Sequence, residues 1–127
     1  MKLIILLFAI TYSACADPCD KTMEKWVKLL APFQNQCIEE TNVSKEYAKN
    51  WLVKQEYFDD PILQCYLTCL HRHLGIMLSD NSIDTNTLSQ IAEGVNKDMA
   101  EFCNHKVKLV DNPCKKSMEI SKCALDP

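Results

Sequence analysis

Apolar side chains recur along this chain at the three- and four-residue intervals that are typical of amphipathic helices. The first such stripe consists of Met23, Trp26, Val27 and Leu30. Pro32 follows it and should kink or end the helix, because proline has no N–H for the helical ladder. The segment from Phe33 to Ile38 should then continue the helical pattern. Asp20 is placed to cap this first helix, so the segment from there to Ile38 is predicted to be helical.

Polar side chains mark where the next helices should begin. Ser44 can cap a second helix, and Asp60–Pro61 and Asn112–Pro113 each place a capping side chain before a proline at the first helical position. The first of these pairs should open a helix through Met77, and the second a helix from Pro113 to about Leu125. The predicted apolar stripe of the helix after Pro61 consists of Ile62, Tyr66, Cys69, Leu70, His73 and Met77.

Two more helices are predicted between the helix that begins at Pro61 and the helix that begins at Pro113. They follow a turn at residues 80–84 (DNSID) that ends in a capping aspartate. Gly94 and Asn96 should separate them. The stripes of the two helices comprise Leu88, Ile91, Ala92 and Val95 in one, and Val95, Met99, Phe102 and Cys103 in the other. No segment alternates convincingly with the period of a strand. The pattern predicts an all-α domain of about six short helices.

The first residues have a different pattern and a different meaning. Lys2 precedes an uninterrupted apolar run at residues 3–10, and Ala14 and Ala16 occupy the small-residue positions of a cleavage site. This layout is typical of a secretory signal peptide, so we expect cleavage after Ala16 and a secreted domain of residues 17–127 in an extracellular fluid. No later apolar run is long enough for a membrane span, so no membrane insertion is expected.

Composition excludes several classes of function. The chain has only two glycines, nineteen positions apart, whereas phosphate-binding loops, dinucleotide fingerprints and nucleophile elbows need closely spaced glycines. A formal charge of −3 argues against nucleic acid as a partner. No motif of a hydrolytic or metal-dependent enzyme is present. We therefore expect a protein that is not an enzyme and uses no cofactor.

Eight cysteines in 127 residues indicate an oxidising compartment or a metal centre. Cys65 and Cys69 lie one helical turn apart, and Cys114 and Cys123 point to opposite sides of a helix, so neither pair should bond internally. The remaining pairings stay open on this ground. A structural zinc site normally brings short Cys and His pairs, and only Cys65 and Cys69 fit that spacing loosely. Because a secreted chain favours oxidation of its cysteines, no metal site is expected.

From Cys37 onward, the cysteine spacing is C-x27-C-x3-C-x33-C-x10-C-x8-C. This pattern strongly resembles the six-cysteine insect odorant-binding proteins, the pheromone and general odorant-binding family, whose most specific marks are the x3 and x8 intervals. The segment CYLTCL at residues 65–70 is similar to a core helix of that family, and residues 80–84 to the turn before its fourth helix. The x33 interval is short, which suggests a trimmed junction between the fourth and fifth helices.

The resemblance implies helices around an apolar cavity, held by three interlocked disulfides, Cys37–Cys69, Cys65–Cys114 and Cys103–Cys123. It implies a carrier of small hydrophobic molecules such as odorants or pheromones, in olfaction or transport, which would reach an olfactory receptor only indirectly. The alternative is a secreted interaction protein, of venom or salivary type, on the same scaffold.

Mapped onto the helical stripes, the family's pocket predicts ligand-binding residues at Leu70, His73, Leu74, Met77, Leu88, Ile91, Ala92, Val95, Met99, Phe102 and Met118. Trp26 and Leu30 are further candidates. The simpler interpretation of any single member is plain core packing. Tyr66 or His73 is expected to fix a ligand hydroxyl or carbonyl. Acid-triggered release through His73 is less expected, because only four residues follow Cys123 and cannot form a tail helix that enters the pocket.

Cys19 is left without a partner in this scheme. It is either a free or capped thiol near the N-terminus or the site of an intermolecular disulfide that makes a homodimer. Asn42-Val43-Ser44 is a formal glycosylation sequon, although Ser44 also suits a helix cap.

Overall fold

The computed structural model describes residues 23–125, and it shows six helices in that range. The expected signal peptide and Cys19 lie outside the described residues. The helices are the N-terminal helix (described over residues 23–41), α2 (Lys45–Val53), α3 (Pro61–Leu74), α4 (Thr85–Ile91), α5 (Lys97–Val107) and α6 (Pro113–Leu125). Within this range, Met77 and Ile83 form one isolated antiparallel β-bridge. The predicted all-α class is confirmed.

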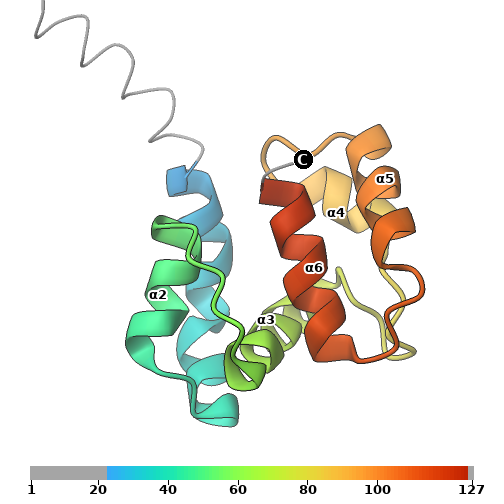
Figure 1. Cartoon of the computed structure of the whole chain (residues 1–127). Coiled ribbons are helices and arrows are strands. Elements are labelled where there is room, and N and C mark those ends of the chain that lie inside the picture. Colours follow the sequence, from blue (N-terminus) through green and yellow to red (C-terminus); the bar gives the residue numbers. More distant parts are fainter. Residues whose placement is uncertain (1–22, 126–127) are drawn as a thin grey trace, which may run out of the picture.

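α3 lies at the centre of the arrangement (Figure 1). The N-terminal helix and α2 run side by side on one side of it, whereas α4, α5 and α6 gather on the other. α6 makes the most extensive packing with α3, and α5 packs on both α4 and α6. The side chains at the middle of α3 are fully buried, and they include Leu63, Tyr66, Leu67 and Leu70.

The predicted caps form hydrogen bonds at the helix starts. Ser44 Oγ accepts from the N–H of Tyr47 at 3.4 Å, and Asp60 Oδ1 accepts from the N–H of Ile62 at 2.9 Å. The side chains of Asp84, Asn96 and Asn112 accept in the same way at the starts of α4, α5 and α6. These bonds satisfy backbone donors that have no partner inside a helix, which is why the sequence could locate the starts.

Two helix boundaries differ from the sequence-based expectation. The helix predicted to run through Met77 ends at Leu74, because Gly75 takes a left-handed φ of 77° and its N–H bonds the carbonyl of Arg72. Pro32, expected to kink or end the first helix, lies inside an unbroken helical segment. Pro32 is exposed, so water can bond the carbonyl that loses its helical partner there.

Gly75→Ala should lower the free energy of unfolding by about 1 kcal/mol, because an alanine would have to adopt a left-handed backbone. The added Cβ would meet only Thr87 Cγ2 at 3.8 Å, an ordinary contact, so the loss is expected from the backbone alone. Gly94, with φ of 84° and no atom within 4 Å of an added Cβ, should give a similar loss on substitution by alanine. Urea denaturation measures both, and unchanged midpoints would contradict the expectation.

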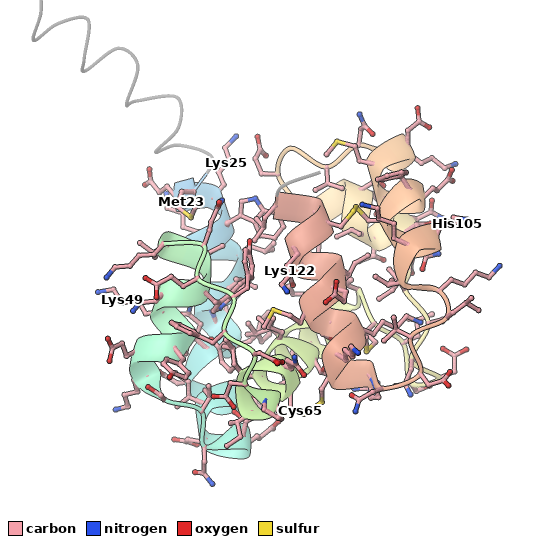
Figure 2. The ribbon with its side chains drawn as sticks, in the orientation of Figure 1. Met23, Lys25, Lys49, Cys65, His105 and Lys122 are labelled. Carbon is pink, nitrogen blue, oxygen red and sulfur yellow. A yellow bond between two sulfur atoms is a disulfide. The ribbon has the colours of Figure 1, made fainter. Side chains whose placement is uncertain are left out.

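Three disulfides connect the helices, and they are the three that the family resemblance implied. Cys37–Cys69 joins the N-terminal helix to α3, with a Cα–Cα distance of 5.7 Å. Cys65–Cys114 joins α3 to α6, and Cys103–Cys123 joins α5 to α6. Cys65 is labelled in Figure 2 near the beginning of α3. As expected, the two cysteines of α3 bond different neighbours rather than each other.

None of the helices in the described part of the chain has the length and apolar content that a membrane span requires.

Candidate functional site

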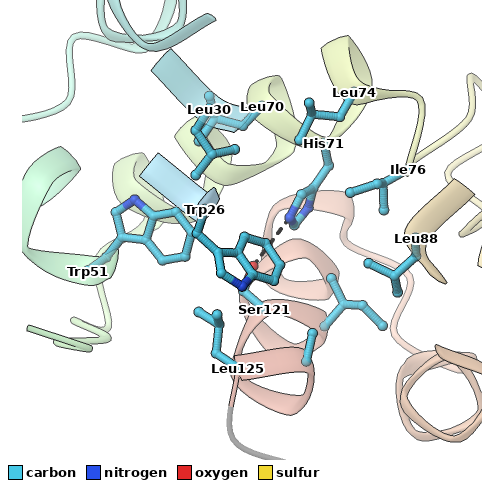
Figure 3. A pocket seen from close by; sticks show the side chains of 12 residues that line it. Trp26, Leu30, Trp51, Leu70, His71, Leu74, Ile76, Leu88, Ser121 and Leu125 are labelled. Atoms are coloured by element: carbon cyan, nitrogen blue, oxygen red, sulfur yellow. Dashed lines mark hydrogen bonds between the residues drawn. The ribbon is translucent and has the colours of Figure 1, made fainter. Parts of the chain in front are cut away.

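A largely enclosed cavity lies where the N-terminal helix, α3, α4 and α6 converge, and Figure 3 shows it from close by. Ten of its twelve lining residues are apolar: Trp26, Leu30, Trp51, Leu70, Leu74, Ile76, Leu88, Ile120, Ala124 and Leu125. The two polar ones are His71 and Ser121. This composition is typical of a site for an apolar molecule that carries few polar groups.

In this conformation the cavity is almost filled by its own side chains. The volume in which the centre of a water-sized sphere can move is about 20 Å³, which corresponds to about one water molecule. An organic ligand therefore has to displace part of the wall. Ala124 and Leu125 are partly exposed at the end of α6, whereas Leu30, Leu70 and Ile120 are at most 1% exposed. The partly exposed lining residues are therefore Ala124 and Leu125 at the end of α6 and Leu74 at the end of α3.

His71 is the polar side chain that faces the cavity from α3. Its Nε2 lies 3.3 Å from Ser121 Oγ, a hydrogen bond drawn in Figure 3, and its Nδ1 is buried with no partner among residues 23–125. Burial lowers the pKa of His71 to about 4 from its ordinary 6.5, so the ring is neutral at pH 7. A neutral ring offers either one donor or one acceptor at Nδ1, according to its tautomer.

One side of the cavity is closed by contacts between the N-terminal helix and the turn after α4. Trp26 Nε1 donates to the backbone carbonyl of Glu93 at 3.1 Å, and Lys25 Nζ lies 3.1 Å from a Glu93 carboxylate oxygen. Figure 2 shows Lys25 near the start of the described part of the N-terminal helix. The indole bond holds Trp26 against the cavity, whereas the ion pair is exposed and contributes little to stability.

The structure brings only part of the sequence-predicted set to this cavity. Leu70, Leu74 and Leu88 line it, as do the further candidates Trp26 and Leu30. The core holds Met77, Ala92, Val95 and Met118 outside the lining, and Ile91 and Met99 are partly buried elsewhere. His73 and Phe102 are exposed, Phe102 at 53%. Ligand contact stays a prediction for every member of the set, and those outside the lining could reach a ligand only through a different pocket or another shape of this one.

Sequence reasoning missed His71 and the wall from α6. On α3 the apolar positions are so dense that two stripes compete, and the buried one runs through Leu63 and Leu67, whereas Ile62 is 47% exposed. His71 lies on the buried side, and His73, about 200° further round the helix, lies on the surface. In α6, the spacing of Ile120 and Ala124 by four positions was a signal that could have indicated the same cavity.

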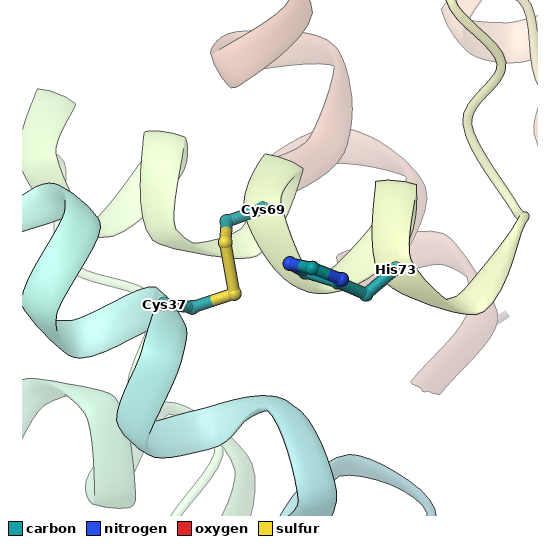
Figure 4. A group of neighbouring side chains, drawn as sticks. All are labelled: Cys37, Cys69 and His73. Carbon is teal, nitrogen blue, oxygen red and sulfur yellow. A yellow bond between two sulfur atoms is a disulfide. The ribbon is translucent and has the colours of Figure 1, made fainter.

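A second group of side chains has the residue types of a metal site. Cys37, Cys69 and His73 place one ligand atom each within 4.8 Å of one another (Figure 4). The two sulfurs are bonded to each other, and metal coordination by cysteine needs thiolates, so they are not available as ligands in this state. The His73 ring stacks on Phe33 with centroids 5.2 Å apart, which gives it a packing role on the surface.

Comparisons with known proteins identify relatives of this chain. A sequence model of the PBP/GOBP family matches residues 19–126. General odorant-binding protein 99b from Drosophila melanogaster is 27% identical over 91 residues, which cover 69% of this chain. The chain spans 60% of the length of that relative. No solved structure gives a significant match.

Proposed function

This chain belongs to the PBP/GOBP family, and we propose that it is a secreted carrier that holds one small hydrophobic molecule, such as an odorant or pheromone, in the cavity between the N-terminal helix, α3, α4 and α6. The family is one of binding proteins rather than enzymes, and its members carry odorants and pheromones. The single observation that supports the site is an enclosed wall in which ten of twelve residues are apolar.

Burial of apolar ligand surface would supply the affinity, at about 25 cal/mol for each Å² before the costs of association. The ligand makes room for itself by displacing Ala124 and Leu125 at the end of α6. The opposite wall stays in place, because its side chains Leu30 and Leu70 are at most 1% exposed. Such a wall can accept ligands of different shape, which suits a carrier.

His71 positions the ligand's polar end in this proposal. The sequence had suggested Tyr66 or His73, but His73 is on the surface and Tyr66 does not line the cavity. A ligand hydroxyl or carbonyl would bond Nδ1, the ring atom that has no partner within the described chain. A ligand with one such group at one end and hydrocarbon elsewhere fits the composition of the wall.

Ala124→Phe should weaken binding of the fluorescent apolar probe N-phenyl-1-naphthylamine by about tenfold or more, because overfilling an apolar site costs about 1–3 kcal/mol. Ala124 is partly exposed, so the larger ring can be placed without loss of the fold. The matched control is Ala31→Phe, which adds the same ring to an exposed position of the N-terminal helix that does not line the cavity. Fluorescence titration measures both variants, with circular dichroism to verify folding.

Equal affinity in wild type and Ala124→Phe would place the probe outside the cavity. Failure of the folded wild-type protein to bind any apolar probe would contradict the carrier function, and it would favour the secreted interaction protein on the same scaffold.

A further inference from the structure

A second hollow lies between the N-terminal helix and α2, where Tyr66 of α3 also lines it. This groove has a volume of about 330 Å³, within the range of about 300–1,000 Å³ that is usual for small-molecule sites. It shares no lining residue with the cavity around His71. Its apolar lining comprises Val27, Ile38, Ala48, Leu52, Val53 and Tyr66.

The polar lining of this groove is positive. It consists of Lys45 and Lys49 of α2 and Gln34 of the N-terminal helix, and it includes no carboxylate. Both lysines are exposed, and within residues 23–125 neither forms an ion pair, in contrast to Lys25, Lys28 and Lys122. Lys45 and Lys49 are four positions apart, so they share one face of α2 and repel each other slightly. Figure 2 shows Lys49 on the outer side of that helix.

The groove also holds a buried polar group without a partner. Tyr66 is 0% exposed, and its hydroxyl makes no hydrogen bond within the described residues. Burial raises the pKa of Tyr66 to about 12, so the group is a neutral hydroxyl at physiological pH. Leaving such a group unpaired inside the folded protein is unfavourable.

We propose that this groove is a second binding site, separate from the cavity, and that it takes one monocarboxylate with a single hydrocarbon chain, such as a medium-chain fatty acid. The hydrocarbon chain lies along the apolar lining between the two helices. The carboxylate lies between the ammonium groups of Lys45 and Lys49. A neutral molecule of the same length cannot make the charge contact with the two lysines, so it binds more weakly.

The test is titration with dodecanoate below its micelle concentration, followed by calorimetry and native mass spectrometry. Dodecanoate should bind wild type and also Ala124→Phe, in which the cavity is filled but the groove is unchanged. Lys45→Gln/Lys49→Gln should weaken groove binding by about fivefold or more, because the carboxylate loses both of its charge partners. The matched control Lys106→Gln/Lys115→Gln removes two lysines from another surface hollow and should bind as wild type does.

A second variant pair tests the apolar part of the groove. Val53 is 48% exposed at the end of α2, so Val53→Glu should fold and should weaken dodecanoate binding by placing a negative charge in the groove. Leu109→Glu, at a side chain that is 91% exposed and far from the groove lining, introduces the same charge as a control. Dodecanol, with the same chain and no charge, should bind the groove several times more weakly than dodecanoate.

Loss of dodecanoate binding in Ala124→Phe together with full binding in Lys45→Gln/Lys49→Gln would assign the fatty acid to the cavity and overturn this proposal. Lysine-dependent binding to phosphatidylglycerol vesicles without binding of free dodecanoate would also overturn it, because the face would then recognise a lipid surface. The naphthylamine titration reports on the cavity independently. The proposed carrier function and the proposed second site can therefore be refuted separately.

Discussion

Replacing Cys65 and Cys114 together by serine is expected to lower the free energy of unfolding by about 4 kcal/mol. The bridge closes a segment of 49 residues, and closing a loop of that length removes about this much conformational entropy from the unfolded chain. Both cysteines are only partly buried, so the two serines bring little desolvation cost. A domain of this size typically has about 5–15 kcal/mol of net stability, so the variant should be folded but marginal. Urea denaturation at pH 7 measures the loss.

Cys103→Ala/Cys123→Ala provides the comparison, because its bridge closes only 20 residues. The same entropy argument gives a loss of about 3 kcal/mol there. These two cysteines are buried, which is why alanine rather than serine replaces them. A loss below about 1 kcal/mol for the Cys65/Cys114 pair, with the other two bridges verified as formed by mass spectrometry, would contradict loop closure as the source of the stabilisation.

Acidification from pH 7.5 to pH 4.5 is expected to cost the wild-type protein about 2–3 kcal/mol of stability through His71 alone. Burial lowers the pKa of His71 to about 4 in the folded protein, whereas the unfolded chain titrates near 6.5. The unfolded chain therefore binds a proton that the folded protein does not. Stability is fully present above pH 6.5 and is lost as the pH falls towards 4. No other titratable group lines the cavity around His71.

His71→Asn should remove this pH dependence, because asparagine does not titrate. His73→Asn is the matched control, since it removes a histidine from the exposed surface of the same helix and keeps His71. Hydrogen bonds from Ser82 and Thr87 lower the pKa of Asp80 and of Asp84, respectively. These two carboxyl groups therefore titrate below this pH window. Equal slopes of unfolding free energy against pH in wild type and His71→Asn would contradict the assignment.

The sequence located most of the helices because their start signals act locally. Ser44, Asp60 and Asn112 each satisfy backbone donors within the same turn, so their effect does not depend on the rest of the fold. The end of α3 was harder to locate. The apolar pattern continues through Met77, and Met77 is indeed buried, but it is reached through the left-handed turn at Gly75 rather than by a further helical turn.

The cavity could be predicted only in part. Its lining depends on how the helices cross, and a periodic pattern identifies a buried stripe without showing which neighbour that stripe meets. Leu70 and Leu88, which the sequence suggested as ligand contacts, line the cavity. Ile76 enters it from the turn after α3, and Leu125 enters it from the end of α6. The pairing of the cysteines, in contrast, was predictable from the resemblance because the spacing of the six is so specific.

The two tryptophans of this chain, Trp26 and Trp51, both line the cavity. Their relative exposures are 8% and 2%, so both indoles are shielded from solvent. The tryptophan emission of the protein, excited at wavelengths that tyrosine does not absorb, therefore originates at the walls of this one compartment. Occupancy of the compartment can be followed on the unlabelled protein, through a shift or quenching of that emission.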